Sequence, residues 1–464
     1  MRSYTSSFKR LFLVFLIFPL VVSLWGFALP CIYEETFLGE LKHKIELLRT
    51  TDSPRIILVG GSAIAFGVDS DLLEEQLPGF HVVNFGMYAA LGTSVMLDIS
   101  QAYIKNGDIV ILIPELQKQT LSGYFDADVM WQALDGDFGE ILHLPKEKII
   151  ALAGSFFAFA GQKLRCFAKG EKMMPSSVYA RSSFNEHGDV ASPLCERNIM
   201  PNGVDIGMMV EYNEDTMDEW YVERLQEYYD LLMKKGATLW YGICPVNKAA
   251  IVEDDTLERY YEAILEKTDI PILGNPNDSA MAKEWFYDTN FHLNNSGKIV
   301  YTKQLIEAIK AMLSDSSQTM VDTLEMPTIQ FPVAEEGDDS DEDCFVYKKT
   351  EEGYVVIEVM EEKERLIVPA HHDGEAVVVI ESMACNAREI VIQANIRRIM
   401  NGAFAGCDNL EKIIMEQTSP SLCQVSFDLL EGTNADVYVP MALVNGYKTD
   451  YFWSIHSHRI HGLK

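Results

Sequence analysis

The stretch that decides the fold of the larger part of this chain is Arg55-Ile-Ile-Leu-Val-Gly-Gly-Ser-Ala63. Its apolar run is short and uninterrupted, which is typical of a strand buried on both faces in the middle of a parallel sheet. Two glycines and a serine follow at once, as at a tight turn from a strand into a helix. We therefore predict a parallel strand whose carboxyl end carries Ser62.

Similar apolar runs recur along the chain, and stretches with helical spacing of their apolar residues separate them. This alternation predicts a doubly wound α/β domain over residues 36–313. Residues 116–213 are less regular and are expected to form an insertion over the carboxyl edge of the sheet, where substrate loops are carried. The further strands are predicted at His81–Asn84, Asp108–Ile113, Ala237–Ile243 and Ile270–Leu273, and the main helices at Phe37–Arg49, Thr93–Lys105, Met217–Lys235, Thr256–Lys267 and Ser296–Leu313.

The composition limits the partners of this chain. Its 464 residues are too many for one ordinary core, so two or three domains are expected. The formal net charge of −31 argues against nucleic acid as a partner, because polyanions are bound through Lys and Arg. Eight cysteines without a CxxC pair do not indicate a disulfide framework. Cys166 and Cys195 could pair outside a cell, but small buried side chains are the simpler interpretation.

Residues 1–35 are predicted to hold a short tail and a membrane anchor. Leu11–Leu29 is uncharged and almost wholly apolar, basic residues precede it, and an acidic stretch begins at Glu34. This arrangement places the N-terminus inside and the following domains outside the cell membrane. Phe27-Ala-Leu-Pro30 is a poor cleavage site, which favours an anchor over a cleaved signal peptide.

The composition changes twice in the last third of the chain. Residues 314–343 are rich in Ser, Pro and acidic residues and predict a solvated linker. Residues 344–464 contain short units of strand, turn and apolar insert that only a stacked neighbour can bury. The unit Gly402-Ala-Phe-Ala-Gly-Cys-Asp-Asn-Leu-Glu-Lys-Ile413 resembles the BspA-like leucine-rich repeats of bacterial surface proteins. That resemblance implies a small β-rich repeat domain.

Ser62 and His292 are the residues that we predict to do chemistry. Backbone N–H groups at the strand-to-helix turn can bind an oxyanion beside Ser62, although a serine there can also simply cap the helix. His292 stands on a loop just before the last helix, which in a doubly wound fold can bring it against Ser62. We expect His292 to take the serine proton and return it to the leaving group, with Asp288 orienting the ring.

Three blocks of this domain resemble the SGNH (GDSL-like) hydrolase superfamily, and more closely its membrane-anchored branches that act in acyl modification of cell-surface polymers. The resemblance spans roughly residues 50–313. It implies a flavodoxin-like sheet, Ser62 as nucleophile, His292 as base, and the backbone N–H groups of Ser62 and Gly86 as oxyanion donors. The three blocks are Gly60–Ser62, Asn84–Gly86 with Gly92 after it, and Asp288–His292.

Two departures from the family pattern bear on the site. The family's third block supplies an Asn side chain to the oxyanion hole, whereas the third strand here runs into Ile113-Pro-Glu115. A carboxylate there would repel a developing oxyanion, so Glu115 must point away or do another job. Asn84 or Asn290 could replace the missing donor. The second departure is the spacing of Asp288, which stands four residues before the histidine where the family has three.

No metal or cofactor is expected. His456, His458 and His461 crowd the C-terminus, but no carboxylate or cysteine accompanies them locally, and a solvated tail is the simpler interpretation.

Together these observations predict an extracytoplasmic serine esterase or O-acyltransferase acting on acyl esters of a cell-envelope glycan or a related polymer. Its partners would be that polymer, the membrane through the N-terminal helix, and a membrane acyltransferase. The competing hypothesis is a catalytically inactive surface adhesion or scaffold protein that binds ligands through its repeats. Two observations discriminate between them: whether Ser62 and His292 lie within hydrogen-bond reach, and whether the pair lies beside a pocket instead of a filled surface.

Overall fold

The structure is a computed structural model, and it describes residues 21–463 except 176, 201–202, 328–340, 351, 362, 418–419, 421–422, 427 and 451. The chain divides into two compact units, which are described separately. The larger unit comprises Met1–Glu196, Met208–Phe286 and Asn290–Met326, and the smaller unit comprises Arg197–Gly207, Tyr287–Thr289 and Pro327–Lys464.

The larger unit is built on a five-stranded parallel sheet with the strand order β2-β1-β3-β4-β6. Every residue of β1 and β3 is buried, as their continuous apolar runs predict. The predicted parallel sheet is therefore confirmed. Its strands are β1 (Arg55–Gly60), β2 (His81–Gly86), β3 (Ile109–Ile113), β4 (Thr238–Gly242) and β6 (Ile272–Leu273).

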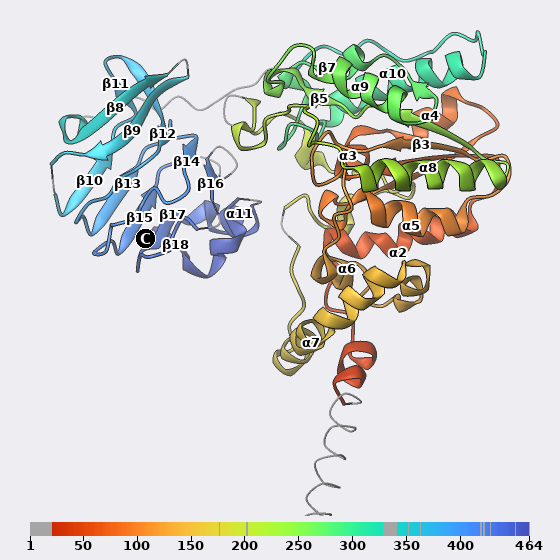
Figure 1. Cartoon of the computed structure of the whole chain (residues 1–464). Helices are drawn as coiled ribbons and strands as arrows, with labels where there is room; N and C mark the ends of the chain where they lie inside the picture. Colours follow the sequence, from red (N-terminus) through yellow and green to blue (C-terminus); the bar gives the residue numbers. More distant parts are fainter. Residues whose placement is uncertain are drawn as a thin grey trace, which may run out of the picture. The chain divides into compact units, whose positions relative to one another are not determined.

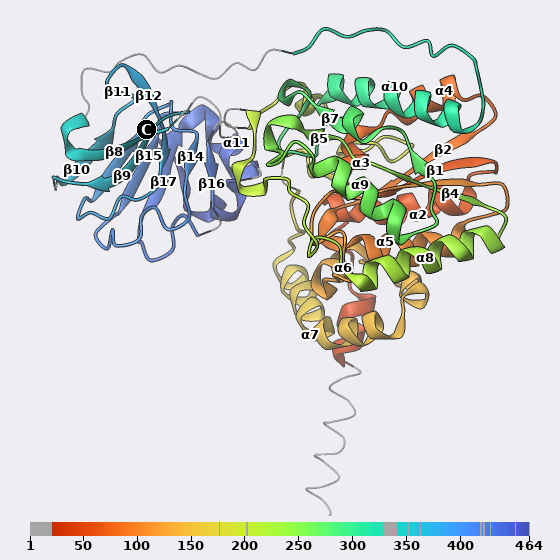
Figure 2. The same ribbon diagram turned by 45° about the horizontal axis from the view of Figure 1, so that its top comes forward.

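Helices cover both faces of this sheet (Figure 1). The helix α5 packs beside α2 and α8, whereas α10 packs beside α3 and α4. Figures 1 and 2 show these two groups on opposite sides of the strands. The helices are α2 (Leu41–Thr50), α3 (Ser62–Gly67), α4 (Ser70–Gln76), α5 (Thr93–Tyr103), α8 (Glu219–Lys234), α9 (Thr256–Lys267) and α10 (Asn295–Met312).

A buried ion pair holds the amino end of the sheet. Arg55 donates from Nη2 to Asp108 Oδ2 at 2.5 Å and from Nε to Oδ1 at 3.1 Å, and both side chains are 0% exposed. Arg55 also donates to the carbonyl oxygens of Leu48 in α2 and Tyr103 in α5. Removing one partner of such a pair leaves a buried charge and costs about 3–5 kcal/mol. The strands and two helices are thus tied together at the end of the sheet away from Ser62.

The predicted insertion, residues 116–213, contains two helices and a long stretch of short 3-10 turns. The helices α6 (Ala127–Ala133) and α7 (Lys146–Lys169) pack against each other. Farther along, Val190 donates its backbone N–H to the carbonyl oxygen of Ala65 in α3 at 2.8 Å. The insertion therefore reaches the helix that begins with Ser62.

The predicted anchor and linker are described only in part. Of Leu11–Leu29, residues 11–20 lie outside the described residues, and residues 21–28 are helical. Among the residues that the structure describes, no helix is both long and apolar enough to cross a membrane. The anchor stays a prediction. In the linker, residues 315–327 contain no helix or strand, and residues 328–340 lie outside the described part.

The smaller unit is β-rich and is built from stacked, parallel strands. One sheet has the order β10-β13-β15-β17-β18, and a second has the order β16-β14-β12-β9-β8. In the first sheet Arg365 pairs with Glu389, Glu389 with Lys412 and Lys412 with Asp436, which are 24, 23 and 24 residues apart. This period lies in the range of leucine-rich repeats. The predicted β-rich stack is confirmed, and the resemblance to the BspA-like family stays a prediction.

The strands of the first sheet are β10 (Arg365–Val368), β13 (Glu389–Ile392), β15 (Lys412–Met415), β17 (Asp436–Pro440) and β18 (Ile460–Leu463). The second sheet begins with an antiparallel hairpin of β8 (Phe345–Thr350) and β9 (Gly353–Val359) and continues through β12 (Glu375–Ile380), β14 (Arg398–Ile399) and β16 (Gln424–Val425). A core of apolar side chains, among them Leu366, Ile390, Ile413 and Val437, fills the stack.

Two expectations about single residues can now be judged. Cys166 and Cys195 are buried, which agrees with small core side chains. The solvated tail expected around the three C-terminal histidines is correct only in part, since His458 and His461 are exposed but the segment is ordered. His456 is 5% exposed and contacts the carbonyl oxygen of Ser426 at 3.0 Å, and His461 lies on β18, beside Asp436 at 3.3 Å. Stacking of the last strand on the repeat array orders this segment.

Candidate active site

Ser62 lies at the carboxyl end of β1, as predicted. Gly61 is the N-cap residue of α3 and provides no side-chain hydrogen bond to the helix. Ser62 is the first residue of the helix. The Ser62 hydroxyl is directed to His292 and Glu115 instead of to the helix backbone. The alternative in which Ser62 merely caps the helix is therefore not what the structure shows.

His292 lies on a loop that is fixed by the hydrogen bonds of one asparagine side chain. Phe286 and Leu293 form an antiparallel bridge across this loop. Asn294, which is 0% exposed, accepts the N–H of Gly297 at 2.8 Å and so caps α10. Its amide group donates to the carbonyl oxygens of Glu284 and Phe286 at 2.7 and 3.1 Å. The start of α10 and the loop are thereby locked together.

The structure brings the two main predicted residues together. His292 Nε2 lies 2.8 Å from Ser62 Oγ, and both residues are only 4% exposed. The imidazole stacks on the ring of Phe66, which belongs to the same helix as the serine. A hydrogen bond of this length is the contact that a general base needs to activate a serine.

The second ring nitrogen of His292 contacts the insertion. Nδ1 lies 3.2 Å from the hydroxyl oxygen of Tyr179, a residue that is 9% exposed. When Nδ1 carries the proton and donates it to Tyr179, Nε2 is left as an acceptor for the Ser62 proton. The opposite tautomer would place a proton on Nε2 and prevent this transfer. Tyr179 can therefore select the tautomer in which His292 acts as a base.

Glu115 lies against Ser62 and does not point away from it. Its Oε1 accepts the backbone N–H of Ala63 at 2.8 Å and lies 3.3 Å from Ser62 Oγ, whose single proton can be donated either to Glu115 or to His292 Nε2. Its Oε2 is buried with no hydrogen-bond partner among the described residues. Burial raises the pKa of the Glu115 carboxyl, although the Ala63 N–H, His292 and the Ser62 hydroxyl each lower it. Desolvation thus favours the neutral acid at this position.

Gly61 makes the space for this carboxyl group. A Cβ atom at Gly61 would overlap both carboxyl oxygens of Glu115. The second glycine of the Gly60-Gly61-Ser62 turn is therefore required by the close approach of Glu115, and any side chain there would displace the acid.

Two of the predicted oxyanion donors, Gly86 and Asn84, are engaged in a buried network. Gly86 donates its N–H to Asn84 Oδ1 at 2.9 Å, and the Asn84 amide donates to Ile64 O at 2.9 Å and to Asp189 Oδ1 at 2.7 Å. The Lys44 side chain joins the same network and donates to the carbonyl oxygen of Asn84 at 2.9 Å. These contacts would have to rearrange before Gly86 or Asn84 could serve an oxyanion, and their predicted roles stay predictions.

Asp288 and Asn290 lie on the same short segment as His292, and both are buried, at 1% and 0% exposure. Asn290 donates to Met208 O at 2.8 Å and accepts from the Asn247 amide at 3.3 Å, so its side chain joins two loops. Burial raises the pKa of Asp205, and the charge of Asp288 adds to this rise. The orienting role of Asp288 stays a prediction.

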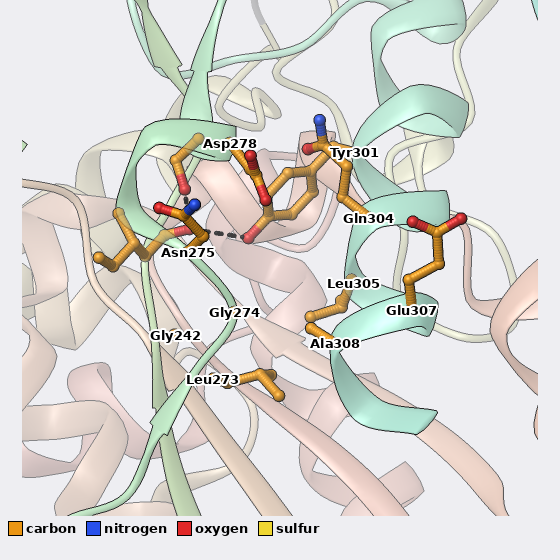
Figure 3. A pocket seen from close by; sticks show the side chains of 12 residues that line it. Gly242, Leu273, Gly274, Asn275, Asp278, Tyr301, Gln304, Leu305, Glu307 and Ala308 are labelled. Atoms are coloured by element: carbon orange, nitrogen blue, oxygen red, sulfur yellow. Dashed lines mark hydrogen bonds between the residues drawn. The ribbon is translucent and has the colours of Figure 1, made fainter. Parts of the chain in front are cut away.

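A separate cavity of about 170 Å³ opens at the carboxyl ends of β4 and β6 (Figure 3). Tyr301 of α10 and Ser279 line it, and both donate to the carbonyl oxygen of Ile243 at 3.1 Å. Figure 3 shows Asn275, Asp278 and Gln304 around its polar side. Ser62 and His292 are not among its lining residues.

One group among the described residues has the composition of a metal site. Glu342, His372 and Asp373 in the smaller unit have ligand atoms within 4.8 Å of one another. His372 Nδ1 already lies 2.6 Å from Glu342 Oε1, and Asp373 is exposed, so an ion pair accounts for the arrangement. The described residues around Ser62 include no such group.

Sequence reasoning did not identify Phe66, Tyr179, Asp189 or Lys44. Phe66 has a local signal, since it follows Ser62 by four residues and so lies on the same side of the helix. The other three come from distant segments and have no signal in one sequence. Comparison with models of known protein families gives no match, and comparison with curated protein sequences gives none either.

Proposed function

We propose that this protein is an extracytoplasmic serine esterase or O-acyltransferase that acts on acyl esters of a cell-envelope glycan or a related polymer. The observation that carries the proposal is the 2.8 Å contact between Ser62 Oγ and His292 Nε2 at the carboxyl edge of a parallel sheet. The three sequence blocks that resemble the SGNH superfamily support the same chemistry. The membrane-anchored branches of that superfamily suggest the polymer as substrate, the cell membrane as location and a membrane acyltransferase as partner.

In the proposed reaction, Ser62 Oγ attacks the ester carbonyl carbon while its proton passes to His292 Nε2. The tetrahedral intermediate collapses, the bond to the leaving alcohol breaks, and His292 returns the proton to that alcohol. The acyl group is then on Ser62. Water or a glycan hydroxyl, deprotonated by His292, attacks the acyl-serine and regenerates the hydroxyl. Water gives hydrolysis, and the glycan gives transfer.

Glu115 fits this reaction as a neutral acid. An ionised carboxylate beside Ser62 would repel the oxyanion, whereas a protonated carboxyl group can donate a hydrogen bond to it. Burial, which raises the pKa of this group, favours the protonated form. The unpartnered Oε2 atom would carry the proton, and Glu115 would replace the family's missing asparagine donor.

A second candidate function has one observation in its favour. The Ala63 N–H is donated to Glu115 and the Gly86 N–H to Asn84, so two backbone donors near Ser62 are already satisfied. This is what a surface adhesion or scaffold protein with an inactive α/β unit would show. In that case the repeats would bind the ligand.

A fluorophosphonate probe distinguishes the two functions, because it reacts only with an activated serine. The full chain in detergent, the Ser62→Ala and His292→Ala variants, and the control Ser100→Ala would be labelled in parallel. Ser100 is also buried, but it contacts Tyr228. Labelling of the wild type and of Ser100→Ala alone supports the enzyme. No labelling of a chain with native circular dichroism and cooperative unfolding supports the scaffold.

A further inference from the structure

The helix α7 carries apolar side chains on its exposed side as well as on its buried side. From Ile149 to Gln162 it has no charged residue. The flanking Lys148 and Lys163 point inward and pair with Asp98 at 2.6 Å and Asp135 at 2.7 Å. A surface helix of a water-soluble domain normally turns its apolar stripe inward. Here Leu152 and Phe159 do pack inward beside the two buried lysines, but large apolar side chains also face outward.

The outward side chains are large. Ile150 is 61% exposed and Phe157 is 52% exposed, with Ile149 at 36% on the same helix. Small residues without charge, namely Ala151, Ala153, Gly154, Ala158 and Gly161, fill the exposed positions between them. This helix therefore presents a continuous uncharged surface about four turns long. Such a surface marks a site of interaction with an apolar partner.

The helical residues 21–28 extend this surface. The ring of Phe27 stacks on Phe156 of α7 with centroids 4.9 Å apart, and a Cβ atom at Gly26 would overlap the same ring. Phe27 and Leu24 are themselves 48% and 62% exposed. Figures 1 and 2 both show α7 beside this short helix. Together Leu24, Phe27, Ile149, Ile150 and Phe157 form what we call the apolar face.

The exposed charges around the apolar face are more often basic than acidic. With the buried Lys148 and Lys163 left aside, residues 146–172 contain four Lys and Arg and two Glu, whereas the whole chain has 38 basic and 69 acidic residues. Arg165, Lys169 and Lys172 are exposed near the end of α7, where Lys169 lies 3.8 Å from Glu171 and Lys172 lies 3.5 Å from Glu34. Basic residues beside an apolar helical surface are typical of a helix that lies in a membrane interface, because they contact anionic headgroups.

We propose that α7 lies flat in the surface of a lipid bilayer, with the apolar face in the acyl-chain boundary and the basic residues among the headgroups. The chain itself favours a bilayer over a second protein, since the uncharged, apolar residues 11–20 lead directly into residues 21–28. Trp25 lies within residues 21–28, and tryptophan is enriched at membrane–water interfaces. This contact is independent of any chemistry at Ser62 and would fix the larger unit against the membrane.

The test places a lipid-sensitive fluorophore on the full chain. In a Cys31→Ser background, whose remaining cysteines are buried, Ile150→Cys and Phe157→Cys are labelled with an environment-sensitive dye. The chain is inserted into nanodiscs of phosphatidylcholine and phosphatidylglycerol containing spin-labelled lipid. Leu265→Cys on α9 is the matched control, because Leu265 is an apolar helix residue that is 53% exposed.

We expect blue-shifted emission and several-fold stronger quenching by spin-labelled lipid at positions 150 and 157 than at 265. Equal lipid quenching at all three positions, with equal access to aqueous iodide, would overturn the proposal. Protection from iodide without lipid quenching would overturn it too, because a protein surface would then cover the apolar face. Native circular dichroism of each labelled variant establishes that folding is retained.

Discussion

The ring of Phe66 lies face to face with the imidazole of His292, with 4.2 Å between their centroids and 3° between their planes. Phe66 stands one helical turn after Ser62 in α3, so Ser62 and the ring that supports His292 belong to one turn of helix. The relative position of Ser62 and His292 therefore depends on α3 as a rigid helix.

We expect Phe66→Leu to lower kcat for an acyl ester by about 10- to 100-fold, because a small displacement of the base is costly in a preorganised site. Steady-state hydrolysis is the measurement. Phe159→Leu, a change at another buried phenylalanine, should leave kcat unchanged. Equal losses in the two variants would mean that Phe66 acts through stability alone.

Tyr179→Phe is expected to slow the acylation of Ser62 about fivefold, since a hydrogen bond worth about 1 kcal/mol no longer selects the His292 tautomer. The Tyr179 ring contacts remain in this variant. Acylation is followed by rapid mixing, and the ring nitrogens of His292 by nuclear magnetic resonance. Tyr212→Phe, at another buried tyrosine of the insertion, is the control. Unchanged nitrogen shifts in Tyr179→Phe would contradict the role given to the hydroxyl.

Glu115→Gln and Glu115→Ala should behave differently. Glutamine keeps an acceptor for the Ala63 N–H and a neutral donor for the oxyanion, so most activity should remain. Alanine should lose about 100- to 1,000-fold in kcat, as when an oxyanion-hole donor is removed. The measurement is kcat for both variants beside the wild type. Loss of activity in Glu115→Gln equal to that in Glu115→Ala would show that the carboxyl group itself is needed.

The Glu115 substitutions also predict a dependence on pH. Because burial raises the pKa of this carboxyl, the folded protein holds its proton at pH values where the unfolded chain has lost it. Stability from this group is therefore full at low pH and falls as pH rises through the window above the ordinary pKa. The free energy of unfolding of Glu115→Gln should fall less than that of the wild type over this window. Parallel curves would refute a raised pKa.

The stability that Lys44 contributes is expected to change with pH in the opposite direction. Burial lowers its pKa from 10.5 to about 8, although Glu40 and Asp189 act against this shift. Between these values the unfolded chain binds the proton and the folded protein does not, so stability rises as pH increases from about 8 to 10.5. Lys44→Met should lack this rise. The measurement is denaturant unfolding at several pH values, and the same slope in both proteins would contradict the prediction.

Local sequence determined much of the sheet. The runs at β1 and β3 could be identified because a strand buried on both faces needs every side chain to be apolar, and no distant residue changes that requirement. The insertion helix α7 was not predicted, since its exposed positions are apolar, as are the buried Leu152 and Phe159, and since two of its buried residues are lysines. Apolar residues on both sides of a helix hide the usual helical stripe.

The sequence by itself identified the two residues on which the proposed chemistry rests, since a serine after a Gly-Gly turn and a histidine before the last helix are set by their own neighbours in the chain. Only the tertiary structure decided how these residues are arranged. The packing of segments 230 residues apart sets the contact between Ser62 and His292. The same packing sets the buried state of Glu115 and the presence of Tyr179 on the second ring nitrogen. Burial and hydrogen bonding between distant segments are properties of the assembled core, and no local pattern encodes them.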